Sequence, residues 1–427
     1  MRVLVVGGGG REHALAWRLA RSASVDEVVA APGNPGMADV ARCVPVDPDD
    51  PAAVAQLADD LAVDLVVVGP ERPLVNGVVD AVEARGRRAF GPTAVGAQLE
   101  GSKAWMKEVL SGAGVPTAVH ASFSAGEEDA ALAFLQTLGG LYVVKTDGLA
   151  AGKGVVVTDS LAEARDAVRM YLSGAAFGEA GRTVVIEEGL VGPELSVLVV
   201  CNGDPDAAVP LAPAQDFKRI GDGDTGPNTG GMGAYSPVPI AGPHLVRQVM
   251  TTAVRPTLYA LEDEGVTYRG VLYAGLMLTA DGPKVLEYNV RFGDPETQVV
   301  VPRLRSDLGA LCLAAAAGEP DLEAQFADDA CVTVVLASAG YPSSPRTGDE
   351  IRGLDAAGAV PGVTVFHAGT ARRDDGALVT AGGRVLDVTA VAPGLRDARD
   401  RAYEAAALIS WPGVQYRHDI ATSAAAS

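Results

Sequence analysis

The first hundred residues alternate short apolar runs with segments of helical spacing. Residues 2–6, 28–31 and 65–68 are mostly apolar and rich in valine and alanine, which is typical of strands buried on both faces. Residues 12–20 carry apolar side chains at helical spacing, and residues 51–61 have the same helical character. Because strands and helices alternate, we expect an open, largely parallel α/β sheet in this part of the chain.

The next part combines predicted strands with a loop rich in glycine and lysine. Residues 141–145 and 155–158 are predicted strands, and the connection at 145–154 carries three glycines and two lysines. We expect the two strands to run antiparallel and the loop to be a lid whose lysines reach anionic oxygens. The alternative is a glycine-rich hairpin with solvated lysines. A surface helix is predicted at 159–172.

Two further predicted strands, 183–190 and 194–200, are separated by a short linker. Such a connection suits an adenine base, because backbone groups near Glu187 to Leu190 can read the base edge. Glu194 can then hold the ribose hydroxyls. The alternative is an ordinary strand connection with solvated carboxylates.

The remaining pattern predicts a long connection and a separate C-terminal domain. Residues 215–237 are rich in glycines that alternate with charged and hydroxyl residues. We interpret this segment as a functional loop. From about residue 329 the alanine-rich sequence gives way to short predicted strands at 332–336 and 363–367 and a late helix at 396–409. We interpret this last part as a small domain of mixed structure.

Length and charge narrow the classes of function. The chain has 427 residues, which implies two to four domains. Its net charge of −20 opposes non-specific binding to nucleic acid, although a local cluster of cations can still bind small phosphorylated substrates. The longest strongly apolar windows, such as 271–278, fall well short of the roughly 18 residues of a membrane span. The N-terminus also lacks the features of a signal peptide, so we expect a cytoplasmic protein with no membrane or nucleic-acid partner.

The spacing of residues excludes three common motifs from this sequence. The glycine run at 7–10 places Glu12 where the third glycine of a dinucleotide fingerprint belongs. A Walker A motif ending at Lys153 would need glycine at Asp147 and a hydroxyl at Gly154. The four cysteines include no C-x-x-C pair, so we expect reduced, mostly buried thiols and no disulfide framework or zinc site.

Carboxylate, amide and guanidinium side chains lie closest together in the sequence within residues 284–298. Glu287 and Asn289 are two apart, so on a strand they share a face, and their oxygens suit a hard cation such as Mg²⁺. Arg291 stays in step with that face if the strand persists, and the chain then turns at 293–295. The stretch therefore predicts a pocket for phosphate and carboxylate chemistry. A Glu-x-Asn pair alone also fits a half-buried strand whose polar face meets water.

Several longer motifs resemble those of one enzyme family. They are VGGGGREHAL at 6–15, LEGSK at 99–103, DGLAAGKG at 147–154, DTGPNTGGMGAYS at 224–236 and RFGDPETQ at 291–298. The match continues through RTGD at 346–349 and FHAGT at 366–370, so it spans nearly the whole chain in order. On these motifs the chain resembles the phosphoribosylamine–glycine ligases of purine synthesis, in the ATP-grasp superfamily.

The resemblance implies a fold of mixed α/β and α+β class. A pre-ATP-grasp, open α/β N-domain would span 1–100, and a two-lobed ATP-grasp core would span 101–327 with a lid at about 120–190. A small C-terminal mixed domain would span 328–427. The implied reaction joins glycine to 5-phosphoribosylamine through glycyl phosphate, using ATP as co-substrate and Mg²⁺ or Mn²⁺, and gives glycinamide ribonucleotide, ADP and phosphate. We expect a monomer with small-molecule partners.

The resemblance also implies roles for individual residues. The residues expected to bind the nucleotide are Lys103, Lys145, Gly152, Lys153, Gly154, Glu187, Glu188, Leu190 and Glu194. Glu287 and Asn289 match the family's magnesium ligands. The residues expected at the glycine and acyl-phosphate site are Asp216, Lys218, Arg291 and Asp294.

Two alternatives stay open at the level of sequence. Another ATP-grasp carboxylate–amine ligase, such as a carboxylase subunit or a peptide ligase, would share the fold but would not require glycine. A nucleotide-binding sensor would use the same residues without turnover and would release no ADP. The departures from the family's pattern are mild: a second glycine where members often carry another residue, and Thr146 where alanine is more usual.

Overall fold

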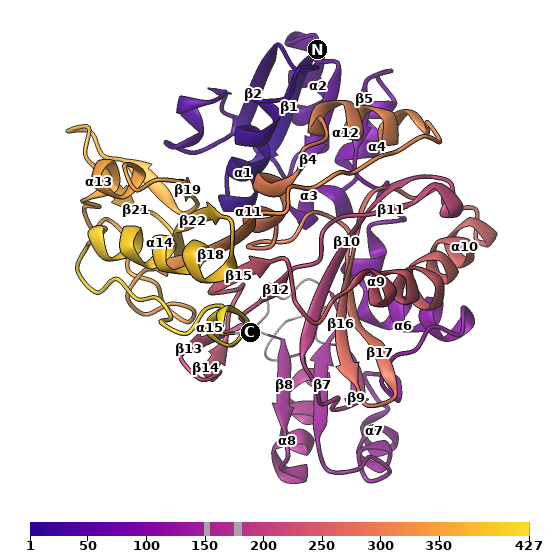
Figure 1. Cartoon of the computed structure of the whole chain (residues 1–427). Helices are drawn as coiled ribbons and strands as arrows, with labels where there is room; N and C mark the ends of the chain where they lie inside the picture. Colours follow the sequence, from indigo (N-terminus) through magenta and orange to yellow (C-terminus); the bar gives the residue numbers. More distant parts are fainter. Residues whose placement is uncertain (149–153, 175–181, 427) are drawn as a thin grey trace.

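The structure is a computed structural model that describes residues 1–148, 154–174 and 182–426. Figure 1 shows the N-terminal part at the top of the view, the C-terminal part at its left and the predicted lid at the bottom. No helix among these described residues has the length and apolar character needed to cross a membrane. Cys201, Cys312 and Cys331 are buried free thiols as predicted, whereas the free thiol of Cys43 is exposed.

A parallel sheet forms the N-terminal part, with the strand order β3-β2-β1-β4-β5. Its strands are β1 (Arg2–Gly7), β2 (Glu27–Pro32), β3 (Arg42–Cys43), β4 (Leu65–Val68) and β5 (Arg88–Phe90). The connecting helices are α1 (Gly10–Leu19), η1 (Met37–Asp39), α2 (Pro51–Asp60), α3 (Glu71–Val75) and α4 (Val78–Glu83). The predicted α/β sheet is confirmed, and α2 begins where Asp50 accepts hydrogen bonds from two backbone N–H groups of its first turn.

Helix α1 begins two residues earlier than predicted, inside the glycine run. Glu12 is 2% exposed, and its Oε2 accepts the Gly9 N–H at 2.6 Å. A Cβ at Gly7 would lie 2.6 Å from Glu12 Cγ, and a Cβ at Gly69 would lie 2.2 Å from Glu12 Oε1. Glu12, which stands where the fingerprint requires a glycine, therefore fills the space beside the glycine loop. Its carboxylate also accepts the N–H of the residue that precedes the helix, as in a capping box.

An antiparallel sheet occupies the middle of the molecule, with the strand order β11-β10-β16-β17. Its strands are β10 (Glu194–Asn202), β11 (Val209–Pro210), β16 (Arg269–Thr279) and β17 (Gly282–Asn289). The nearby helices are α5 (Gln98–Gly101), α6 (Lys103–Gly112), η3 (Pro205–Ala207), α9 (Pro243–Val249), η4 (Met250–Val254), α10 (Arg255–Asp263), α11 (Thr297–Val300), η5 (Val301–Arg303) and α12 (Leu308–Ala317). Ser102 caps α6 at its N-terminus, because its Oγ accepts the Trp105 N–H at 3.1 Å.

The predicted lid forms a sheet with the strand order β6-β9-β7-β8 and its own apolar core. Its elements are β6 (His120–Ser124), α7 (Glu128–Leu135), β7 (Tyr142–Thr146), β8 (Val155–Thr158), α8 (Leu161–Leu172) and β9 (Thr183–Glu188). As predicted, β7 and β8 are antiparallel. Val144, Val184 and Ile186 pack with Tyr171 and Leu172 in a cluster separate from the cores of the other parts, which suits a lobe that moves as a unit.

The C-terminal sheet has the strand order β12-β15-β18-β22-β19. Its strands are β12 (Gln215–Asp216), β15 (Gly233–Ser236), β18 (Ala330–Ala337), β19 (Val363–His367) and β22 (Arg384–Ala392). Two hairpins and three helices complete this part, namely β13 (Arg219–Gly221) with β14 (Thr225–Asn228), β20 (Thr370–Arg372) with β21 (Leu378–Thr380), α13 (Leu354–Gly358), α14 (Leu395–Leu408) and α15 (Thr422–Ala425). The interpretation of 215–237 as a loop is wrong for its strand residues, because β15 pairs with β18 about a hundred residues later in the chain.

Candidate active site

Glu287 and Asn289 lie on one face of β17, which pairs antiparallel with β16. Arg291 follows the end of the strand, and its Nη2 donates to Asn289 Oδ1 at 3.3 Å. The three side chains therefore have the alignment that their spacing predicts. Gly275 is opposite Glu287 on β16, where a Cβ would lie 3.1 Å from Glu287 Cγ, so the glycine leaves room for the carboxylate.

Cations surround the carboxylate of Glu287. Burial by itself would raise the pKa of Glu287. The nearby charges of Lys218 and Lys145, together with those of Lys103 and Arg291, outweigh burial and lower this pKa. Within the described residues, no group of three or more His, Cys, Asp or Glu side chains is arranged to hold a metal ion. A cation at this face would therefore take further ligands from a substrate such as a phosphate ester.

Lys107 is a buried cation that the sequence did not single out. Its Nζ donates to Glu187 Oε2 at 2.9 Å and to Thr117 Oγ1 at 2.7 Å, and its side chain is 1% exposed. Lys145 Nζ lies 2.7 Å from Glu187 Oε1, so one carboxylate on β9 joins the lid to α6. The sequence signal for Lys107 was its place four residues after Lys103, which puts both on one face of a helix.

The predicted phosphate-binding loop begins and ends in described residues. Lys103 Nζ donates to the Gly148 backbone oxygen at 2.7 Å, which ties the beginning of the loop to the start of α6. Gly154 lies at the other end, directly before β8. Gly152 and Lys153 lie outside the residues that the structure describes.

The connection from β9 to β10 contains the residues expected to hold adenosine. Glu187 is 2% exposed, so the alternative of a solvated carboxylate is wrong for this residue. Glu188 is partly exposed; its Oε1 accepts the Val119 N–H at 3.0 Å and lies 3.6 Å from Lys284 Nζ. Leu190 is half-buried. The two adjacent glutamates therefore contact different residues: Glu187 pairs with two lysines of the site, and Glu188 lies near Lys284.

Lys218 joins two carboxylates from different strands. It forms an ion pair with Glu194 at the start of β10, and its Nζ lies 3.7 Å from Asp216 Oδ1 on β12. Burial raises the pKa of Asp216 to about 7, although Lys218 opposes this shift. The structure therefore brings Glu194, expected at the adenosine, together with two residues expected at glycine.

Arg291 and Asp294 contact residues to which the sequence assigned no role. Arg291 Nη2 lies 2.9 Å from Glu100 Oε1, and its Nε lies 3.5 Å from Glu71 Oε2. Asp294 Oδ2 lies 3.1 Å from Nη2 of Arg384 on β22. Burial would raise the pKa of Asp294, but Arg384 and Arg11, the hydrogen bond from Gln298 and the charge of Arg291 together outweigh burial and lower it. Asp294 is thus in direct contact with the C-terminal part.

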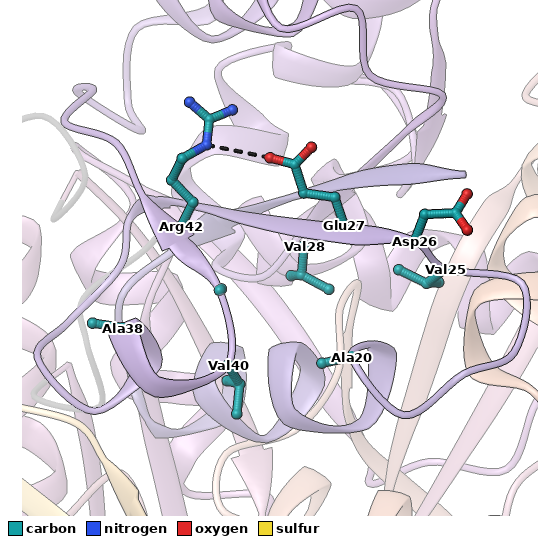
Figure 2. A pocket seen from close by; sticks show the side chains of 9 residues that line it. Ala20, Val25, Asp26, Glu27, Val28, Ala38, Val40 and Arg42 are labelled. Atoms are coloured by element: carbon teal, nitrogen blue, oxygen red, sulfur yellow. Dashed lines mark hydrogen bonds and ion pairs between the residues drawn. The ribbon is translucent and has the colours of Figure 1, made fainter.

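A separate hollow lies at the edge of the N-terminal sheet (Figure 2). Its volume is about 500 Å³. The residues that line it are Ala20, Val25, Asp26, Glu27, Val28, Ala38, Val40, Ala41 and Arg42. Figure 2 shows the ion pair between Arg42 and Glu27, whose Nε and Oε1 atoms are 3.3 Å apart. None of the predicted site residues lines this hollow, so the face of β17 remains the candidate active site.

Comparison with family models accounts for most of the chain. Residues 1–100 match the N domain of phosphoribosylglycinamide synthetase, residues 101–297 match its ATP-grasp (A) domain, and residues 331–423 match its C domain.

Individual relatives cover the full length. A phosphoribosylamine–glycine ligase from Streptomyces coelicolor is 53% identical over 430 residues, which is 100% of each chain. The crystal structure of a phosphoribosylamine–glycine ligase from Thermotoga maritima matches with a TM-score of 0.83 at 35% identity and covers 98% of this chain and 100% of that one. The biotin carboxylase domain of Hydrogenobacter thermophilus 2-oxoglutarate carboxylase, in complex with MgADP, ADP and bicarbonate, has a TM-score of 0.73 at 19% identity. It covers 97% of this chain and 91% of that one, which shows a shared fold.

Proposed function

Because the chain belongs to the phosphoribosylglycinamide synthetase family, we propose that it joins glycine to 5-phosphoribosylamine with ATP, giving glycinamide ribonucleotide, ADP and phosphate. The observation that carries the proposal is the row formed by Glu287, Asn289 and Arg291, set among lysine cations. Carboxylate, amide and guanidinium groups in this arrangement suit a substrate that brings phosphates and a divalent cation.

The proposed reaction has two steps. A carboxylate oxygen of glycine attacks the γ-phosphorus of ATP, so glycyl phosphate forms while the bond to ADP breaks. The amine of phosphoribosylamine then attacks the glycyl carbonyl carbon; the carbon–oxygen bond to phosphate breaks and the amine nitrogen loses a proton. Neither step needs an enzyme nucleophile, so the side chains act by positioning and by stabilising charge.

Glu287 and Asn289 would hold the Mg²⁺ or Mn²⁺ ion. Their oxygens are the ligand type these ions prefer, and the cations around the half-buried Glu287 lower the pKa of its carboxylate and so keep it ionised. When bound, the ion would supply Lewis-acid stabilisation of the negative charge on the phosphates of ATP.

The lid would hold the phosphates of ATP. Lys145 Nζ donates to the backbone oxygen of Leu286, directly before Glu287, at 3.4 Å, and Lys103 Nζ donates to the backbone oxygen of Gly148 at 2.7 Å. Both ammonium groups would therefore lie beside phosphates bound near Glu287. Gly152, Lys153 and Gly154 would contribute further contacts to these phosphates. The lid would also keep water from the acyl phosphate, which hydrolyses when exposed.

The adenosine would lie along the connection from β9 to β10. Backbone groups from Glu187 through Glu188 to Leu190 would read the base edge. Glu194 would take the ribose hydroxyls while keeping Lys218 beside it, because its carboxylate has two oxygens and Lys218 pairs with one of them.

Glycine would lie between Lys218 and Arg291. Both cations can offset the charge of its carboxylate and of the transferred phosphoryl group. Asp216 lies beside Lys218, and Asp294 follows Arg291 in the same motif, so these carboxylates would orient the cations and the amine of the acceptor.

We extend the proposal to the organisation of the protein. The domains would divide near residues 100 and 327, although β15 of the core and β18 of the C-terminal part share a sheet. The protein would act as a cytoplasmic monomer, and its four free cysteines support a reducing compartment.

The proposal is tested by the change Glu287→Gln, which keeps the shape of the side chain and removes its charge. Production of glycinamide ribonucleotide, followed by mass, should fall on the order of 100-fold or more, the size typical of losing a preorganised electrostatic group. The control is Asp281→Asn, which removes an exposed carboxylate from the turn between β16 and β17 and should leave the rate unchanged.

Two results would contradict the proposal in different ways. Near-normal turnover by the Glu287→Gln variant would remove this residue from the site. ATP consumption by the unmodified protein with another amino acid in place of glycine, and none with glycine, would overturn the substrate assignment.

A further inference from the structure

The strand β22 in the C-terminal part directs two charged side chains toward the loop that follows Arg291. Arg384 Nη1 donates to the Asp294 backbone oxygen at 2.8 Å, and its Nη2 lies 3.1 Å from the carboxylate of the same residue. Asp387 Oδ2 accepts a hydrogen bond from Gln298 Nε2 at 2.9 Å. Both residues of β22 therefore reach one motif, which spans 291–298.

A β-bulge explains how residues three apart reach the same loop. In a regular strand, Arg384 and Asp387 would point to opposite faces. The pairing of β22 with β18 shifts register between Leu386 and Arg384, which leaves Val385 as an extra residue. Bulges re-aim side chains and often lie next to active sites.

Gln298 connects the two carboxylates. Its Nε2 donates to Asp294 Oδ1 at 2.7 Å as well as to Asp387, which uses both hydrogens of the amide. Gln298 is fully buried, and Asp387 is 1% exposed. One carboxylate oxygen of Asp294 thus accepts a hydrogen bond from Gln298, and the other forms an ion pair with Arg384.

The glycine run of the N-terminal part packs directly against this group. A Cβ at Gly10 would lie 1.8 Å from Asp387 Oδ2 and 2.9 Å from Gln298 Nε2. A Cβ at Gly9 would lie 3.8 Å from Asp294 Oδ2. Three segments that are far apart in the sequence therefore meet at Asp387, and Gly10 is needed because any side chain there would displace the carboxylate.

Asp387 has the surroundings of a neutral hydrogen-bonding group. Its Oδ1 is buried and lacks a hydrogen-bond partner within the part of the chain that the structure describes. Burial, followed by the nearby Asp294, raises the pKa of Asp387 to about 7; Glu12 acts in the same direction, and Arg384 opposes the shift. An asparagine at this position would keep the acceptor for Gln298 without a charge.

We propose that Asp387 is a positioning residue for the ligation, because through Gln298 it fixes the carboxylate of Asp294 beside the N-terminal glycine run. The C-terminal part thereby completes the acceptor end of the active site. This inference rests on the proposed function, in which Asp294 lies near the reacting groups.

The test compares Asp387→Ala with Asp387→Asn in the full-length protein. Asp387→Ala should lower kcat for glycinamide ribonucleotide by about 10- to 100-fold, because misplacing a catalytic group by about 1 Å has effects of this size. Its KM for ATP should change less than about twofold, since none of the residues expected to bind the nucleotide contacts Asp387 within the described residues. Asp387→Asn should restore most of the lost kcat.

Thr389→Val is the matched control for a purely structural effect. Thr389 lies two residues along β22, is 1% exposed, and its Oγ1 donates to Thr333 Oγ1 at 2.8 Å. Loss of this hydrogen bond in Thr389→Val should lower thermal stability but leave kcat near that of the unmodified protein. A kcat for Asp387→Ala within twofold of normal, or a fall shared equally by Thr389→Val, would overturn the inference.

Gly10→Ala tests the same contact from the N-terminal side. It should lower kcat because its Cβ displaces the Asp387 carboxylate. The double variant Gly10→Ala with Asp387→Ala should lose little more than the worse single variant, because both changes disturb one contact. Fully additive losses would contradict the inference.

The outcome also separates this inference from the function on which it rests. If the unmodified protein makes no glycinamide ribonucleotide, the proposed function fails and the inference fails with it. If the unmodified protein makes the product and both Asp387→Ala and Gly10→Ala do so at the normal rate, only the inference fails.

Discussion

At the scale of single residues, two histidines join the beginning of the chain to its end. His13 on α1 accepts the backbone N–H of His367 at its Nδ1, at 2.8 Å, and the ring centroids are 5.7 Å apart. Burial, followed by the nearby His367, lowers the pKa of His13 to about 3. Burial likewise lowers the pKa of His367 to about 4. Both rings are therefore neutral in the folded protein at neutral pH.

This contact predicts a loss of stability in mild acid. Below pH 6.5 the unfolded chain protonates His13, whereas the folded protein does not until about pH 3, so stability falls as the pH falls through this interval. At pH 5 the loss attributable to His13 is about 2 kcal/mol. In His13→Asn the Oδ1 atom can replace Nδ1 as acceptor, so thermal unfolding at pH 7 and pH 5 should show a smaller pH effect than in the unmodified protein. An equal pH effect in both proteins would contradict this account.

Counting along one strand was enough to align Glu287, Asn289 and Arg291, because alternation is a local property. Their chemical roles stay predictions. Lys107 and Asp387 were not found, because their partners lie 80 and 89 residues away in the sequence. No spacing rule links residues that only the fold brings together.

At the scale of elements, one arginine near the C-terminus holds the hairpin of β13 and β14. Arg417 is 1% exposed, and its Nη1 donates to Asp224 Oδ1 at 2.6 Å and to the Arg219 backbone oxygen at 3.2 Å. It also pairs with Asp419 at 2.6 Å and lies 4.9 Å from the centre of the Phe217 ring. Because Phe217 precedes Lys218, the same contact fixes one side of the proposed glycine site.

Arg417→Met should loosen this hairpin while keeping an apolar stem over Phe217. The change removes the hydrogen bonds that the guanidinium donates to Asp224, Asp419 and the Arg219 backbone oxygen, and these bonds tie the hairpin to the C-terminal segment. Limited trypsin digestion should cut after Arg219 several-fold faster than in the unmodified protein. Arg401→Met on α14, whose contacts are to Pro361 and Val391, is the control and should show no change at this position. Unchanged cleavage in Arg417→Met would show that the hairpin is held by other contacts.

Local patterns gave most elements of the N-terminal sheet and the lid, with ends that differ by one or two residues. The helix predicted from 159 begins at Leu161, for example, because Ser160 caps it by accepting the Glu163 N–H at 3.3 Å. The segment 215–237 was not predicted as strands, because its glycines and charges resemble a loop. Its pairing with β18 depends on sequence a hundred residues later, which no local pattern contains.

At the scale of the whole molecule, net charge and local charge have opposite signs. The chain carries −20, yet the candidate active site gathers lysine and arginine cations around one carboxylate. Screening limits the long-range field, so the local group decides what binds there. The acidic remainder opposes nucleic acid, while the site suits a small phosphorylated substrate.

The family and its reaction were predicted from motifs spread over the chain, and the comparisons confirm the family. The domain division and the roles of the site residues stay predictions. The motifs did not predict the contact between the N-terminal glycine run, the loop after Arg291 and strand β22. Each motif is local in the sequence, whereas this contact joins segments that are far apart in it.

The central claim, that glycine is activated as an acyl phosphate, is tested most directly by following oxygen. The protein would be supplied with ATP, phosphoribosylamine and glycine whose carboxylate carries ¹⁸O in both positions, and the released phosphate would be measured by mass. The account predicts one ¹⁸O atom in each phosphate, because the oxygen that attacks the γ-phosphorus leaves with it when the amine displaces the phosphate. Glycinamide ribonucleotide formed together with unlabelled phosphate would contradict the account.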